Sequence, residues 1–188
     1  MVDLPWGDPR TIKFVTNVGL ITSTGPHGDN IMSAEWTHQV SYSPGLIAVA
    51  IGRGKATLEN IEKTKEFGIN LAAVDQAGMA HIAGANHGDK VDKIAALKEL
   101  GYKFSKAKKI NTLMVEGAAM QAECKVVKII DIGDHPIVIG EIVEIYTLSN
   151  KEPLVYHGLK FWNLTETLPR PNEKEMERIK VIIAKHQK

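Results

Sequence analysis

The sequence predicts a mainly β protein, built as a small closed antiparallel barrel with a helical insert. Short runs of β-branched and apolar residues are separated by clusters of Gly, Pro, Asn and Asp, as is typical of antiparallel strands joined by turns. An alanine-rich stretch in the middle of the chain changes to the helical spacing of apolar residues. About six or seven strands with one helical interruption fit a single barrel.

The first half of the chain supplies four of the expected strands. Residues 14–24 (FVTNVGLITST) form a strand that ends at the turn Gly25-Pro26, and residues 31–42 form a second strand with an irregular start. Residues 46–51 (LIAVAI) are apolar on both faces, which is expected of a buried strand. The fourth strand covers residues 67–71.

The second half returns to the β pattern after the insert. Strand segments are expected at residues 115–119, 122–130, 137–148 and 153–164. The stretches 126–130 and 137–143 flank a turn, so they should pair antiparallel. A bulge is expected near Gly140, because the glutamates of this strand do not alternate strictly with its isoleucines.

Helices are expected over residues 57–66, in the insert at 75–100, and in a C-terminal tail. Thr57 is the predicted N-cap of the first helix, and Asn60 lies where a capping box would have Glu or Gln. The insert holds helices at 75–85 and 91–100, with Gly101 as the C′ residue. The tail at 172–188 carries one apolar face and is long enough to pack on the body or on a second subunit.

Composition is that of an ordinary globular domain. The 188 residues fit one domain over 1–188, with 44% hydrophobic and 24% charged residues. A net charge of +1 gives no global field that would attract nucleic acid or an acidic membrane surface. The single cysteine, Cys124, excludes an intramolecular disulfide and any multi-thiolate metal site.

Two further features bear on location. The N-terminal residues MVDLPWGDPRTIKF lack the basic region and apolar run of a signal peptide. No apolar segment approaches the roughly 20 residues that span a bilayer. We therefore expect a cytoplasmic protein with no membrane contact.

The stretch 28–57 carries the residues best suited to bind a ligand. Its small and polar residues, among them Asn30, Ser33, Ala34 and Thr37, suit the polar edge of a flat heterocycle, which Trp36 and Met32 could pack against. The alternative for Trp36 and Met32 is core filling. The following turn, Gly52-Arg53-Gly54-Lys55, opens a helix.

That turn suits a phosphomonoester. A helix N-terminus offers unpaired N–H groups and the positive end of the helix dipole. Arg53 and Lys55 add charges and Thr57 adds a hydroxyl. The pattern is neither a P-loop nor a GxGxxG motif. The alternative is a charged strand-to-helix turn without a ligand.

The histidines point to no metal site. They are scattered, and no HExxH motif or histidine–carboxylate cluster occurs. His157, in a turn beside Gly158, is either a contact to a second substrate or merely exposed. Cys124 is expected to be a small buried residue of a strand.

In combination, several segments resemble the flavin reductase-like family of FMN-binding split barrels, in particular its flavoredoxin or ferric-reductase-like branch. No single segment is specific, but they occur in the family's order between about residues 14 and 164. The matching segments are GDNIMSAEW (28–36), VSYSP (40–44), IGR (51–53), KAT (55–57), EFGIN (66–70) and PLVYHG (153–158). At 43–45 the chain has Ser-Pro-Gly where many members have Asp-Pro-Pro, which alters a turn.

The resemblance implies a fold, a ligand and a set of contacts. The fold would be a Greek-key antiparallel split barrel, and two subunits would form a homodimer with FMN near their interface. The ring would be lined by Met32, Ser33, Ala34, Glu35, Trp36 and Thr37, with Asn30 at its start. The phosphate would be held by Ser41, Arg53, Lys55 and Thr57, with Asn70 close by. His157 would face the open side of the ring.

The function implied is that of an FMN-binding oxidoreductase. NADH or NADPH would reduce the flavin, and free flavin, ferric complexes or a protein partner would receive the electrons. One alternative is a flavoredoxin-type carrier that takes its electrons from a protein. The other is an FMN-binding module without turnover. The sequence does not separate the first two.

Overall fold

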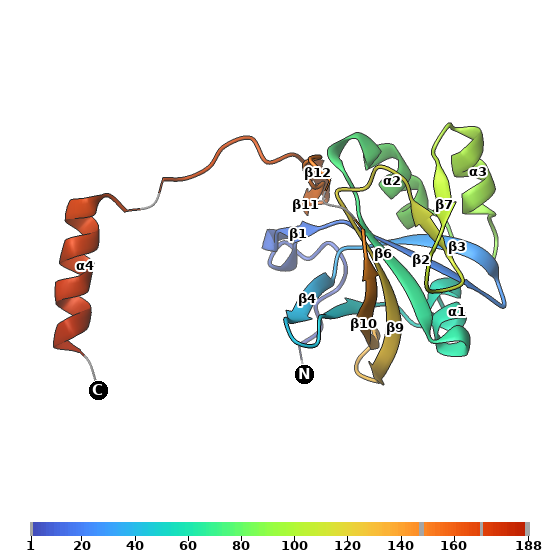
Figure 1. Cartoon of the computed structure of the whole chain (residues 1–188), viewed down its shortest axis with the longest axis horizontal. Coiled ribbons are helices and arrows are strands. Elements are labelled where there is room, and N and C mark those ends of the chain that lie inside the picture. The colour runs from blue at the N-terminus through green and yellow to red at the C-terminus, as the bar shows by residue number, and fades with distance from the viewer. Residues whose placement is uncertain (1, 147–148, 170, 187–188) are drawn as a thin grey trace.

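The computed structural model describes residues 2–146, 149–169 and 171–186. Its main feature is a seven-stranded sheet in the order β3-β2-β6-β9-β10-β5-β4 (Figure 1). All neighbouring strands in this order pair antiparallel, so the mainly β prediction is correct. The strands are β2 (Gly19–Gly25), β3 (Gly28–Ala34), β4 (Thr37–Ser41), β5 (Leu46–Ala50), β6 (Glu66–Leu71), β9 (Met120–Ile130) and β10 (Ile137–Ile145).

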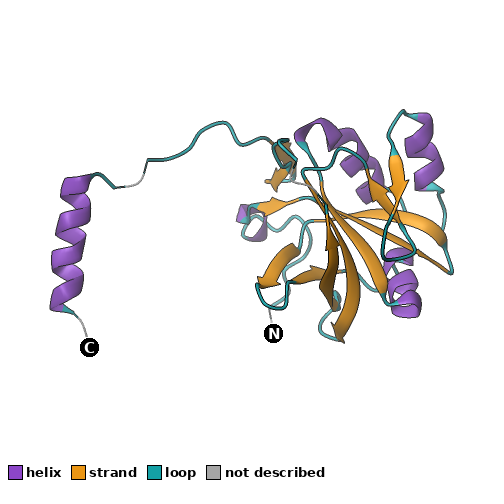
Figure 2. Ribbon diagram, in the orientation of Figure 1, coloured by secondary structure: helices purple, strands orange, loops and turns teal. Residues whose placement is uncertain are grey.

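The sheet curls because its two edge strands are consecutive in the chain. Only Glu35 and Trp36 separate the end of β3 from the start of β4. The Trp36 carbonyl accepts a hydrogen bond from the Ala50 N–H at 3.0 Å, which ties this corner to β5. The sequence predicted one strand over 31–42, and this was wrong: the corner breaks it and sends its halves to opposite edges. The sheet becomes a curled half-barrel (Figure 2).

A second, three-stranded sheet lies beside the half-barrel. It consists of β1 (Thr16–Asn17), β11 (Val155–His157) and β12 (Lys160–Trp162), in the order β1-β11-β12. A short 3-10 helix, Thr11–Lys13, precedes it. The strand predicted at 14–24 is therefore divided at Val18 between the two sheets. The segment predicted at 153–164 is a hairpin, and Gly158 and Leu159 turn it with φ values of 58° and 61°.

Strand β2 is buried on both faces, which places it at the centre of the molecule. Leu20 belongs to a cluster of buried residues that includes Met79, Ile94 and Leu97 of the helical insert. Its neighbour Ile21 belongs to a second cluster inside the half-barrel. Because successive side chains of a strand point to opposite faces, one strand joins both cores.

Helix α1 (Ala56–Thr64) follows β5 and packs on β2 and β3. Its N-cap is Lys55, whose backbone is extended (φ −83°, ψ 129°), so the prediction of Thr57 as N-cap was wrong by two residues. Asn60 does not take part in capping. Its side chain donates to Ser23 Oγ and the Gly28 carbonyl and accepts from the His27 N–H. It fastens α1 to the β2–β3 turn.

The predicted insert at 75–100 contains a 3-10 turn (Val74–Gln76), α2 (Ala77–Ala85) and α3 (Lys93–Glu99). Gly101 follows with φ 89°, as expected of a C′ residue. A short hairpin of β7 (Phe104–Lys106) and β8 (Leu113–Val115) comes next. The strand predicted at 115–119 was wrong, because the chain turns after Val115 and Gly117 has φ 73°.

The pairing of β9 with β10 agrees with the sequence prediction. Ile137 lies opposite Ile130, and the register shifts between Ile139 and Gly140, so the expected bulge is present. A Cβ atom at Gly140 would lie 2.5 Å from the Phe67 ring, which explains why glycine is needed there. Strand β10 ends at Ile145, and residues 147 and 148 of the predicted strand lie outside the described residues.

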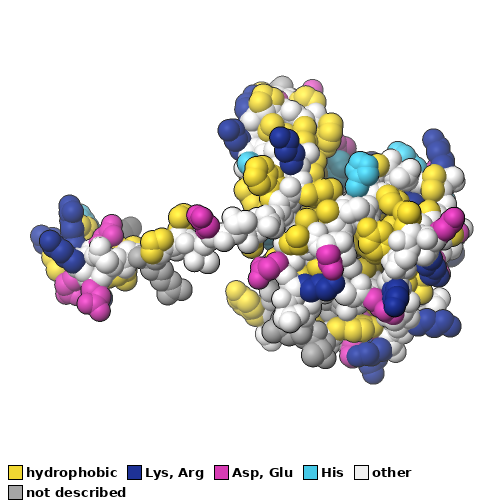
Figure 3. Space-filling model, turned by 90° about the horizontal axis from the view of Figure 1, so that it is seen from above, with side chains coloured by type: hydrophobic (Ala, Val, Ile, Leu, Met, Phe, Trp, Pro, Cys, Tyr) yellow, Lys and Arg dark blue, Asp and Glu magenta, His cyan; other side chains and the backbone are white. Residues whose placement is uncertain are grey.

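The tail carries α4 (Glu173–Lys185), whose N-cap Asn172 accepts a hydrogen bond from the Glu175 N–H at 3.0 Å. No residue of α4 is buried, and the helix stands away from the body at the end of an extended segment (Figures 1 and 3). Residues 187 and 188 of the predicted tail lie outside the described range.

Candidate functional site

A cavity of about 1000 Å³ opens on the outer side of the β3–β4 corner. Its walls come from β3, β5, the start of α1, the loop between α2 and α3, the N-terminal residues and the β11–β12 turn. These segments are far apart in sequence. Eight of the sequence-predicted site residues line it: Asn30, Met32, Ser33, Ala34, Glu35, Trp36, Lys55 and Thr57.

Part of the cavity lining consists of small residues. In β5 the side chains of Ile47 and Val49 are buried in the core, so the alternate residues Ala48 and Ala50 face the cavity. Trp36 is 50% exposed, and its ring meets the His135 ring edge-on at 4.8 Å. The core-filling alternative is therefore wrong for Trp36, which lies on the cavity wall.

Glu35 and Tyr156 also line the cavity. Burial raises the pKa of Glu35, and the charge of His135 opposes that rise. Burial likewise raises the pKa of Tyr156, with a further contribution from the nearby Glu35 carboxylate. Both shifts favour the neutral forms of these groups, a carboxylic acid and a phenol.

Another part of the cavity lining is cationic. Lys55, Ala56 and Thr57 of the first turn of α1 line it, and within the described residues no side chain caps this helix end. The Asn30 side-chain N–H donates to Thr57 Oγ1 at 2.8 Å and holds that hydroxyl in place. The N–H groups and dipole of the helix start favour an anion here.

Lys93 completes this cationic lining, although its role was not predicted from the sequence. Only 3% of the residue is exposed, and its Nζ donates to the carbonyls of Ala83 (3.2 Å) and Asn86 (3.3 Å) at the end of α2. Burial and, to a smaller extent, the charge of Lys55 lower the pKa of Lys93 to about 8, while the charge of Asp89 opposes this shift. The available signal was a lysine in phase with Ile94 and Leu97 on the buried face of a helix.

Five predicted site residues lie outside the cavity lining. Arg53 turns toward the β9–β10 turn, where it pairs with Asp131 and donates to the Gly133 carbonyl at 3.0 Å. Asn70 is fully buried and joins strands, donating to the Leu20 carbonyl and accepting from the Val115 N–H, both at 2.9 Å. In this structure both side chains are therefore hydrogen-bonded to partners outside the cavity lining.

The other three lie at the edges. Thr37 is buried and its hydroxyl donates to the Ala34 carbonyl at 3.2 Å, while Ser41 ends β4. His157 is a neighbour of the lining residues Tyr156 and Gly158, and its Nδ1 lies 3.3 Å from the Phe14 carbonyl. His157 thus stands next to the mouth of the cavity.

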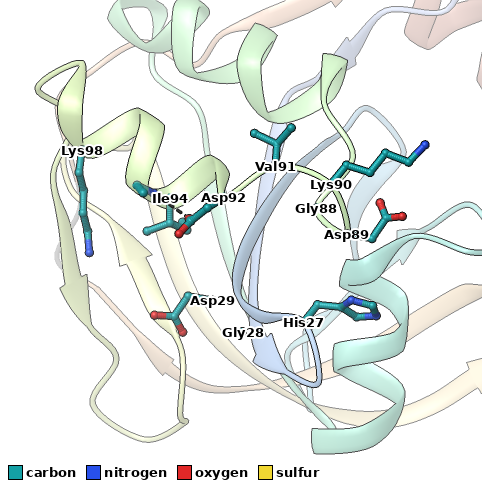
Figure 4. Close-up of a pocket in the computed structure, with 11 residues that line it drawn as sticks. His27, Gly28, Asp29, Gly88, Asp89, Lys90, Val91, Asp92, Ile94 and Lys98 are labelled. Carbon is teal, nitrogen blue, oxygen red and sulfur yellow. Dashed lines mark hydrogen bonds between the residues drawn. The ribbon is translucent and has the colours of Figure 1, made fainter.

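A second cavity of about 540 Å³ lies between the β2–β3 turn and α3 (Figure 4). His27, Gly28 and Asp29 face it from the turn, and Asp92 and Lys98 face it from the other side. Asp92 is already used as the cap of α3, where it accepts from the Ala95 N–H at 2.9 Å. This cavity meets the main one only at Gly88 and holds none of the predicted site residues.

The sequence pattern of the family described as "Flavin reductase like domain" matches residues 11–165. The chain belongs to the flavin reductase-like family. The predicted family is therefore confirmed, and the matched range contains the whole main sheet and the residues of both cavities named above, apart from the N-terminal ones.

Three relatives illustrate the match. A protein of Archaeoglobus fulgidus is 30% identical over 122 residues, covering 65% of this chain and 67% of the relative. A protein named "NADH-dependent flavin reductase" from a Rhodococcus species is 26% identical, with 81% of each chain covered. The reductase component of a flavin-dependent trigonelline monooxygenase from Acinetobacter baylyi is 26% identical, covering 77% of this chain but 44% of the relative.

Solved structures show the same fold. A putative flavin reductase from Haemophilus somnus matches with a TM-score of 0.77 at 19% identity, covering 87% of this chain and all of that one. The flavoredoxin of Desulfovibrio vulgaris (Miyazaki F) matches with a TM-score of 0.74 at 21% identity, covering 92% and 98%. The fold prediction is confirmed. Within the described ranges, none of the helices is both long and apolar enough to span a bilayer.

Proposed function

We propose that this protein is a flavin oxidoreductase that holds FMN in the main cavity and accepts electrons from NADH or NADPH. One observation carries the proposal: a single cavity is lined both by small residues and by two lysines, of which Lys93 is buried. A flavin mononucleotide has the matching shape, with a flat ring at one end and a phosphate at the other. The bound flavin supplies the redox chemistry, and the protein supplies binding and orientation.

In this proposal one group of residues contacts the flavin ring and another holds the phosphate. Ala48, Ala50 and the 32–36 segment give the ring its surface, and Trp36 borders it. The phosphate lies at the start of α1, near Lys55, Thr57 and Lys93. We propose that Arg53, Ser41 and Asn70 take no part in holding it: Arg53 pairs with Asp131, Asn70 bonds to the Leu20 carbonyl, and Ser41 ends β4 outside the cavity lining.

The names of two relatives support NADH as the electron donor and a protein as a partner. A similar protein is named as an NADH-dependent flavin reductase, and another as the reductase component of a monooxygenase. We extend both properties to this chain as proposals, with a protein or free flavin as acceptor. His157, beside the mouth, is placed to contact the incoming donor or acceptor. A cytoplasmic location stays a prediction.

We also propose a homodimer that covers the cavity mouth. Trp6, Phe14 and Val15 line the cavity yet are 79%, 73% and 63% exposed. At the free edge of the main sheet, β4 and the turn after it expose Val40 and Tyr42. Apolar side chains gathered in this way mark an interface. Light scattering on the full chain should give the mass of two chains, and a monomer with full flavin occupancy would contradict this.

The fold likeness to a flavoredoxin supports the carrier as a second candidate. Purified protein should show the visible absorbance of flavin after incubation with FMN. Anaerobic addition of NADH or NADPH should then bleach that absorbance. Bleaching only with a reduced protein donor would favour the carrier, and no bleaching with any donor would leave a module without turnover.

A substitution that fills the cavity tests the proposed position of the flavin ring. The substitution Ala50→Phe puts a ring where the flavin ring is proposed, so it should abolish bound absorbance. Ala95→Phe adds the same ring to an exposed position of α3 and should leave flavin binding unchanged. Retention of FMN by Ala50→Phe would contradict the proposed site.

A further inference from the structure

Two lysines from different parts of the chain meet at one end of the main cavity. Lys55 comes from the turn before α1, and Lys93 from the first position of α3. Within the described part of the chain, neither makes an ion pair with a carboxylate. The two charges are close enough for Lys55 to disfavour the charged form of Lys93.

The burial of Lys93 makes this arrangement unfavourable without a ligand. An ammonium group taken out of water loses its hydration, and two carbonyl acceptors replace only part of it. If Lys93 served only to donate hydrogen bonds to the last carbonyl groups of α2, a neutral donor would be sufficient. A second lysine beside it adds repulsion. An anion bound between the two lysines would balance both charges.

We propose that Lys93 is the specificity-determining residue of the cavity, which selects a flavin bearing a terminal phosphate over the same flavin without one. This inference rests on the proposed flavin function. A phosphate dianion would balance the two lysine charges, and the first turn of α1 would add N–H donors. Riboflavin lacks the phosphate, so it would not balance the charge of the buried Lys93 ammonium group.

The charged groups around Lys93 also predict that FMN binding is coupled to proton uptake. Lys55 faces it from the turn before α1, Asp89 from the loop after α2, and Asp92 adjoins it in the chain; His87 lines the same cavity. In the free protein burial lowers the pKa of Lys93 to about 8, so at pH 8 part of the Lys93 population is neutral. A dianion beside it favours the charged form, so FMN binding at pH 8 should take up a proton.

The test compares two flavins and two lysines. Dissociation constants of FMN and riboflavin are measured on the full chain at pH 7 by quenching of flavin fluorescence. Lys93→Met should weaken FMN by about 10- to 100-fold, the range for hydrogen bonds to charged groups. It should leave riboflavin within about threefold. The control is Lys98→Met, which removes an exposed lysine of the same helix and should change neither constant.

The outcomes distinguish a failure of the proposed role of Lys93 from a failure of the proposed flavin function. Equal weakening of both flavins, or no weakening of FMN, overturns the role of Lys93 and leaves the flavin function standing. If wild-type protein binds neither flavin, the proposed function fails as well. Calorimetry of wild-type protein at pH 8, in two buffers of different ionisation enthalpy, needs no variant. It should show proton uptake with FMN and none with riboflavin; no uptake with FMN overturns the proposal.

Discussion

Two buried charges, Glu123 and Lys93, show how differently one chain treats a charge taken out of water. Glu123 is fully buried in β9 and accepts four hydrogen bonds, from the N–H groups of Lys108, Lys109 and Ile110 and from the Tyr146 hydroxyl. Lys93 is 3% exposed and donates only to two carbonyls. One charge is satisfied within the fold, and the other faces a cavity.

The pKa shifts express the same difference. Burial alone would raise the pKa of Glu123, but the donors around it outweigh burial and hold the pKa below its usual range. For Lys93 burial prevails and lowers the pKa to about 8. A buried charge with a full set of partners fixes structure, here the loop at 108–110. A buried charge without a counter-ion, at the end of a cavity, indicates a ligand.

The largest effect should come from Glu123. The substitution Glu123→Gln keeps the size of the side chain but turns an NH2 group toward backbone donors. We expect the free energy of unfolding to fall by about 3 kcal/mol, because buried N–H groups lose their acceptor. Urea unfolding followed by circular dichroism measures this. The FMN affinity of the folded variant should not change. A loss of affinity without a loss of stability would contradict a purely structural role for Glu123.

A smaller loss should follow removal of one donor from the same cluster. Tyr146→Phe deletes the hydroxyl that lies 2.7 Å from Glu123 Oε1 and leaves the three N–H donors in place. The free energy of unfolding should fall by about 1.5 kcal/mol, as for a hydrogen bond to a charged group. The same urea titration applies. A loss as large as that of Glu123→Gln would show that the hydroxyl alone satisfies this charge.

The smallest effect, of opposite sign, is expected at Lys93 in the flavin-free protein. In the unfolded chain Lys93 keeps its proton to about pH 10.5, whereas in the fold it loses it near pH 8. The penalty on stability is thus complete below pH 8 and is relieved as pH rises. Lys93→Met should be about 1 kcal/mol more stable than wild type at pH 7, with a smaller difference at pH 9. A variant less stable at both values would make Lys93 structural.

The sequence predicted most of the fold because its signals are local. Runs of β-branched residues, the Gly101 stop and the bulge at Gly140 depend on neighbours in the chain. The break at Glu35 and Trp36 was missed, because both halves of the segment have strand character. Only the curling of the sheet, which needs β3 and β4 at opposite edges, decides that the chain must turn there.

The site was predicted in part for the same reason. Asn30 and residues 32–36 line the cavity because they lie on one strand and its corner. The orientation of Arg53 depends on Asp131, 78 residues further along, so the sequence could not indicate that it turns away. Lys93 becomes part of the site only because the insert folds against β3. Charges brought together by tertiary contacts leave little trace in local spacing.

The most direct test is a crystal structure of the full chain with FMN. We expect the phosphate within hydrogen-bond distance of Lys93 Nζ and the N–H groups at the start of α1. The ring should lie against Ala48 and Ala50, and Arg53 should still pair with Asp131. A phosphate held by Arg53 instead, with Lys93 bonded only to the carbonyls of α2, would contradict the account.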